Sequence, residues 1–208
     1  MLKIPYEKNP GNACALACYT MTSRYFFPEV TFKQIANISN WSSGYIVWAF
    51  KFWLWIMNKG IKIINYDIIN LQNWAENGVD GLGENISKKE LRYYIKNTKN
   101  INMYSNDIKK ILAHPNFMHK QKLPTWDNLL AAYKGGAVCE VTLNSNFLDQ
   151  KDGFDVHRVI IIDIEKNNIF FHDPRKNKIL PKRKESIELF KKAWLDKMEG
   201  TELCIYNK

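Results

Sequence analysis

Three side chains in this sequence could together carry out nucleophilic catalysis: the thiol of Cys14, the imidazole of His157 and the carboxylate of Asp173. Cys14 is predicted to lie in the first turn of a helix. There the free backbone N–H groups and the helix dipole stabilise a thiolate and lower the pKa of the thiol. The same N–H groups can bind a developing oxyanion. The alternative is a small buried residue in an Ala- and Cys-rich helix, and Cys14 taken alone favours that alternative.

His157 and Asp173 are predicted to meet across a β-hairpin. His157 directly precedes an apolar, β-branched run at 158–164, and Asp173 ends a second run that begins at Ile169. A tight turn at Asn167-Asn168 places Asp173 near the His157 end of the hairpin. A carboxylate in that position can hold the imidazole in the required tautomer and stabilise its protonated form. The alternative for Asp173 is an ordinary Asp-Pro turn.

The elements that would position these residues follow from apolar periodicity and turn signals. Helices are predicted at 12–26 with Asn12 as N-cap, 31–38, 45–57, from Ser87, 105–113, 126–134 and 185–198. Strands are predicted at 61–64, 137–143, 158–164, 169–172, within 174–181, and at 203–206. Helices precede an antiparallel sheet, so the predicted class is α+β. We expect one domain over 1–208, helical to about 135 and β-rich from about 136 to 208.

The cysteine and histidine segments resemble those of the bacteriocin-processing (double-glycine) peptidase family. In the first segment the resemblance lies in residues 12–17, with Met21 and the aromatic pair Tyr25-Phe26 at the family's offsets. In the second, residues 157–163 and 169–174 resemble the family's His- and Val-rich strand, its turn, and its strand ending in Asp-Pro. Residues 126–141 resemble the helix–Gly–strand unit that precedes the histidine. Residues from about 65 to 120 are unmatched.

This resemblance implies a papain-like cysteine peptidase that cleaves after small residues or double glycine. Cys14 would be the nucleophile, His157 the general base and Asp173 the residue that orients it. The chain departs from the family at two positions, since Ala15 follows the cysteine in place of Gly, and Lys8 replaces a Gln whose amide completes the oxyanion hole. Asn9 is our candidate for that amide, with Asn12 as the fallback.

Other functions stay open at this point. The two departures favour a catalytically weak or inactive papain-like module that binds a peptide or protein partner. Amidase and acyl transferase activity would use the same three residues. We expect a peptide or protein substrate and no cofactor or metal: Gly78, Gly81 and Gly83 do not match a nucleotide-binding fingerprint, and Cys18 lacks the short cysteine spacing of a zinc loop.

The charge of +9, with a pI near 9.3, allows an anionic partner such as nucleic acid or a membrane surface. Much of it lies between 175 and 192, where a solvated basic face is the preferred explanation. Cys18, Cys139 and Cys204 are expected in the core. The apolar run 45–57 is too short to span a bilayer and contains Lys51. With no signal peptide visible, we expect a cytoplasmic protein.

Overall fold

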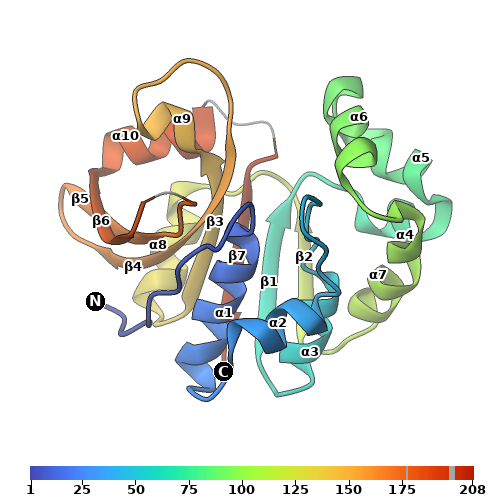
Figure 1. Ribbon diagram of the computed structural model, residues 1–208, viewed down its shortest axis with the longest axis horizontal. Coiled ribbons are helices and arrows are strands. Elements are labelled where there is room, and N and C mark those ends of the chain that lie inside the picture. Colours follow the sequence, from blue (N-terminus) through green and yellow to red (C-terminus); the bar gives the residue numbers. More distant parts are fainter. Residues whose placement is uncertain (177, 197–199) are drawn as a thin grey trace.

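The first part of the chain forms three helices that lead into the sheet. The computed structural model describes residues 1–176, 178–196 and 200–208 (Figure 1). The helices are α1 (Cys14–Phe26), α2 (Phe32–Ile38) and α3 (Phe50–Met57). The N-cap of α1 is Ala13, one residue later than the predicted Asn12. Thr31 caps α2 through a capping box with Gln34, as the Thr-x-x-Gln spacing favours.

The middle of the chain contributes helices and two strands. In order, the elements are β1 (Lys62–Asp67), α4 (Leu71–Asn77), α5 (Val79–Leu82), η1 (Gly83–Asn85), α6 (Lys88–Asn97), η2 (Ile101–Met103), α7 (Tyr104–Leu112), β2 (Phe117–Gln121) and α8 (Trp126–Lys134). Ser87 caps α6, and Thr125 caps α8. Strand β2 was not predicted: its polar sequence Phe-Met-His-Lys-Gln indicated a loop. It forms because it pairs in parallel with β1 at the edge of the sheet.

The last part of the chain is β-rich, as predicted. Its elements are β3 (Val138–Asn144), α9 (Ser145–Leu148), β4 (Val156–Ile164), β5 (Asn168–Asp173), β6 (Leu180–Ser186), α10 (Ile187–Lys191), the π-helical turn η3 (Lys192–Asp196) and β7 (Glu202–Asn207). The end of the helix predicted at 185–198 lies outside the described residues.

The described strands form one seven-stranded sheet in the order β2-β1-β7-β3-β4-β5-β6. All neighbours are antiparallel except β1 and β2. Ile164 faces Ile169, but the turn between them lies one residue earlier than the predicted Asn167-Asn168, because Asn168 is the first residue of β5 and its carbonyl accepts a hydrogen bond from the N–H of Glu165. Ile160 faces His172. This register brings the end of β5 beside the start of β4, and with it Asp173 beside His157.

Different helices cover the two faces of the sheet (Figure 1). Successive side chains of a strand point to opposite faces and so enter two different cores. On β4, Ile160 and Ile162 join the core beneath α1 and α3, whereas Val159 and Ile161 join the core beneath α8, α10 and η3. The cysteine helix α1 packs directly against β4. The strand that carries His157 is therefore fixed between two cores.

The α+β class is confirmed. The helical part supplies β1 and β2 to the same sheet that the β-rich part builds, so the two parts share a single sheet. That residues 1–208 form one domain stays a prediction, which this shared sheet supports. Among the described residues, no helix combines the length and the apolar character needed to cross a bilayer. The apolar run at 45–57 forms the eight-residue helix α3 instead.

Candidate active site

Cys14 is the first residue of α1, and its thiol is only partly exposed. Burial opposes ionisation of this thiol and is the largest single influence on it. A hydrogen bond from His157, the charge of that ring, and the backbone N–H and charge of Arg158 outweigh burial and lower the pKa of Cys14. A thiol with a lowered pKa at a helix N-terminus is the form of cysteine that acts as a nucleophile.

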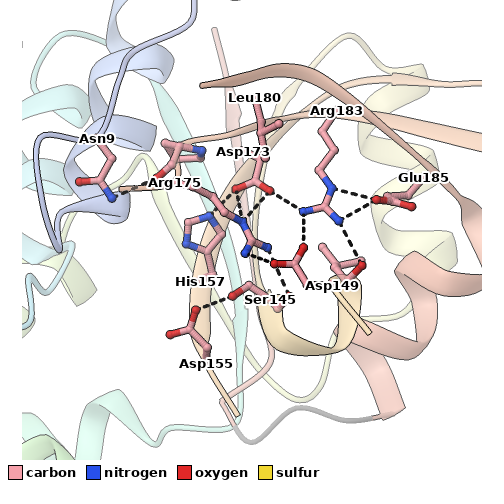
Figure 2. A network of polar contacts seen from close by, with 12 residues as sticks. Asn9, Ser145, Asp149, Asp155, His157, Asp173, Arg175, Leu180, Arg183 and Glu185 are labelled. Carbon is pink, nitrogen blue, oxygen red and sulfur yellow. Dashed lines mark hydrogen bonds and ion pairs between the residues drawn. The ribbon is translucent and has the colours of Figure 1, made fainter. Parts of the chain in front are cut away.

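His157 lies at the start of β4 and contacts Cys14 on one side and Asp173 on the other. Its Nε2 lies 2.7 Å from Oδ1 of Asp173, which leaves Nδ1 for the thiol (Figure 2). The histidine is 7% exposed and Asp173 is fully buried. The structure thus brings together the three residues that the sequence singled out, although their catalytic role stays a prediction.

The charges of the three residues support one another. Burial lowers the pKa of His157, but the hydrogen bonds and charges of Asp173 and Cys14 outweigh it and raise that pKa to about 9. Burial raises the pKa of Asp173, but His157, Arg175 and Arg183 outweigh it and lower that pKa to about 2. At neutral pH the histidine is therefore cationic beside an anionic aspartate, which favours an ion pair of thiolate and imidazolium.

Asn9, the candidate oxyanion donor, is buried beside the cysteine helix. Its Oδ1 accepts hydrogen bonds from the backbone N–H groups of Gly11 and Ala13, and its Nδ2 donates to the carbonyl of Pro174 at 3.0 Å (Figure 2). Asn9 therefore ties the segment before α1 to the residue after Asp173. Asn9 and the fallback, Asn12, both line the cleft that contains Cys14. Whether either side chain completes an oxyanion hole stays a prediction.

The cleft that contains Cys14 and His157 has a volume of about 600 Å³. One wall is aromatic and draws on a segment that the family resemblance left unmatched. This wall includes Tyr45, Trp48, Phe50, Tyr93 and Tyr94. Charged residues also line the cleft: Asp149, Lys151, Asp155, Arg175, Lys176 and Lys178. A cleft of this size and character can hold several residues of an extended peptide.

Beneath the cleft, one arginine contacts two buried carboxylates. Arg158 forms ion pairs with Glu140 on β3 and Glu202 on β7. Burial raises the pKa of Glu140 to about 7, Arg158 opposes this, and Glu202 adds to it. Arg158 also contributes its backbone N–H and its charge to the thiolate of Cys14. This arginine therefore links the structural network in the sheet to the nucleophile.

The remaining cysteines and histidines serve the core and the segments around the site. Cys18, Cys139 and Cys204 are buried free thiols, as predicted. His172 lies on the opposite face from Asp173 and hydrogen-bonds the carbonyl of Ile4 at 2.8 Å. His119 is partly buried and contacts Asn65 through a ring nitrogen, because β2 carries it against β1.

Sequence analysis missed three residues around Asp173. Arg175 and Arg183 were assigned to a solvated basic face, yet their side chains are only 15% and 12% exposed, and both form ion pairs with Asp173. Asp149 bridges the two arginines. Lys176, Lys178, Lys182, Lys184 and Lys192 are exposed, as expected of a solvated face. The available signal was the position of Arg175 two residues after the candidate aspartate.

Comparison with known proteins adds one structural likeness. No family model and no curated protein matches the sequence. A solved structure described as a double glycine motif protease from an AMS/PCAT transporter, in complex with the leader peptide, matches with a TM-score of 0.49 and 13% identity, over 100% of this chain and 94% of that one.

Proposed function

We propose that this protein is a thiol hydrolase that cleaves a peptide or amide bond through a covalent acyl-enzyme on Cys14. The observation that carries the proposal is the contact of His157 with both Cys14 and Asp173 at the wall of an open cleft. This arrangement joins an activated nucleophile, a proton carrier and a residue that orients the carrier.

The reaction follows from the charges in the resting site. The Cys14 thiolate attacks the carbonyl carbon, and the developing oxyanion accepts hydrogen bonds from free N–H groups at the start of α1. The His157 imidazolium gives its proton to the leaving amine as the C–N bond breaks. Neutral His157 then takes a proton from water, whose oxygen attacks the thioester. Release of the carboxylic acid restores Cys14 and the protonated ring.

The walls of the cleft favour a peptide as the substrate. The aromatic residues of the cleft offer stacking and apolar contact to the side chains of a bound peptide. The sequence resemblance suggests small residues next to the scissile bond. Small residues would also fit the crowded start of α1, where Ala13 is buried and Cys14 is partly so.

Pooled peptidyl coumarin amides, followed by intact-mass analysis, test this proposal. Wild type is expected to release fluorophore and to show the mass of an acyl adduct, and Cys14→Ala is expected to show neither. Cys18→Ala is the matched control, since it removes a buried thiol four residues along the same helix. Release that persists in Cys14→Ala would contradict the proposal. Saturable peptide binding without any adduct would favour the binding-module alternative.

A further inference from the structure

Asp173 is held by a cluster of charges on the side away from Cys14. Its Oδ2 accepts a hydrogen bond from Nε of Arg175 at 3.0 Å and from Nη1 of Arg183 at 2.9 Å, while Oδ1 contacts His157 (Figure 2). One carboxylate thus receives donors from three residues. Since Asp173 is fully buried, this set of partners fixes the direction in which each oxygen points.

The two arginines are themselves held in place by acceptors. Asp149 accepts from Arg175 at 2.5 Å through Oδ2 and from Arg183 at 3.1 Å through Oδ1. Glu185 contacts only Arg183 within the cluster, at 2.7 Å. The backbone carbonyls of Ser145 and Leu148 accept further bonds from Arg175 and Arg183. Short α9 and the residues after it therefore form the outer side of the site.

The charges of the two arginines and three carboxylates of this cluster sum to −1, which a protonated His157 neutralises. Arg175 and Arg183 contribute two positive charges, and Asp173, Asp149 and Glu185 contribute three negative ones. Adding the imidazolium brings the sum to zero. If Asp149 were neutral, Asp173 and Glu185 would be the only carboxylates left in the cluster for two guanidinium groups and the imidazolium, and the surplus positive charge would disfavour the imidazolium.

We propose that Arg175 and Arg183 position the Asp173 carboxylate toward His157, and that Asp149 offsets their charge so that His157 can hold its proton. This inference rests on the proposed function, because it assigns positioning residues to the same site. None of the three residues needs to touch the reacting atoms. Their effect reaches Cys14 through Asp173 and His157.

Other charged or titratable groups near His157 also influence its pKa. Cys14 approaches from α1, Arg158 follows on β4, and Asp155 lies in the loop before β4, where it hydrogen-bonds Ser145. Lys151 lies 3.9 Å from Asp149 on the exposed side of the cluster. Cys14 is replaced by Ala in every protein compared below and the other groups stay unchanged, so differences in the pKa of His157 between these proteins report on the cluster itself.

The test is the pKa of His157, measured by NMR titration of labelled histidine in a Cys14→Ala background and assigned with His157→Gln. Asp149→Asn is expected to lower that pKa by about one pH unit, and Arg175→Gln to raise it, because the two changes shift the local charge in opposite directions. Glu185→Gln, the matched carboxylate-to-amide control on the outer side of Arg183, is expected to shift it by less than half as much as Asp149→Asn.

An unchanged pKa in Asp149→Asn, or shifts of the same sign in Asp149→Asn and Arg175→Gln, would overturn the inference, because a structural role alone would perturb the ring in one direction. If Asp149→Asn fails to fold, Arg175→Gln and Arg183→Gln decide the question: both must raise the pKa. This measurement needs no turnover. The titration can therefore be interpreted even if the protein has no hydrolase activity. The hydrolase proposal and the role of the charge cluster can be rejected independently.

Discussion

Nε2 of His157 and Oδ1 of Asp173 lie 2.7 Å apart, although 16 residues separate them in the chain. The β4–β5 hairpin makes this contact, since Ile160 pairs with His172 and the next residue of β5 is Asp173. The proximity follows from strand register rather than from a flexible loop. The two side chains are therefore held together by the sheet itself, beside the thiol of Cys14.

Replacing the carboxylate of Asp173 with an amide should weaken the binding of the proton to His157. In Asp173→Asn, the pKa of His157 is expected to fall from about 9 toward its ordinary value near 6.5, because the partner charge is lost while burial remains. NMR titration of His157 measures this. Asp163→Asn, which changes a carboxylate at the other end of β4, is the control and should leave the value unchanged.

The same substitution should destabilise the protein in a pH-dependent way. The pKa of Asp173 is lowered to about 2 in the folded state, so its stabilisation is present above its unfolded pKa near 3.9 and is lost as pH falls toward 2. We expect Asp173→Asn to cost about 2 kcal/mol at pH 7 and much less near pH 2. Urea unfolding at both pH values checks this, and an equal cost at both would contradict it.

Glu140 should make the stability of the wild type decrease between pH 5 and pH 7. Its pKa is raised to about 7, so the folded state holds a proton that the unfolded state releases near pH 4.5. Stability therefore falls as pH rises through this range. Glu140→Gln mimics the protonated form, and its free energy of unfolding should change less over the same interval. Identical pH profiles for the two proteins would show that Glu140 is ionised throughout.

Removing Arg158 should be far more damaging than neutralising Glu140. Arg158→Met leaves Glu140 and Glu202 buried and close together without their shared cation, which costs about 3–5 kcal/mol. Chemical unfolding measures this loss. The double variant Arg158→Met/Glu140→Gln should recover part of the stability, because one uncompensated carboxylate is gone. A double variant no more stable than the single one would contradict the account of this network.

The close approach of α4 and α5 depends on Gly81. A methyl group at this position would lie 2.1 Å from the carbonyl oxygen of Asn73, so the two helices would have to separate. Gly81→Ala is expected to destabilise the protein by about 2 kcal/mol. Gly11→Ala is the control, since a methyl group there meets nothing within 4 Å. A thermal melt of both variants distinguishes them, and equal midpoints would argue against this packing.

The sequence predicted the class of the fold and the triad candidates because both leave local signals. Capping residues such as Thr31 and Thr125, and the β-branched run before Asp163, are readable from neighbours in the chain. Strand β2 was missed because it is a polar strand at the edge of the sheet, and the residues of β1 with which it pairs lie 54 residues away in the chain. Arg175, Arg183 and Asp149 were missed for a related reason: a buried arginine and a solvated one have the same sequence signature until the fold brings their partners together.

Alkylation of Cys14 by iodoacetamide from pH 5 to pH 9, with peptide mapping, tests the central claim most directly. In the wild type, Cys14 is expected to react near pH 6 far faster than Cys18, Cys139 or Cys204, because only its thiol has a lowered pKa and access to solvent. His157→Ala is expected to abolish this advantage, so that Cys14 reacts only as the pH approaches the pKa of an ordinary thiol. If Cys14 of the wild type reacts no faster than an ordinary thiol near pH 6, or if His157→Ala leaves its rate unchanged, the activated Cys14–His157 pair does not exist.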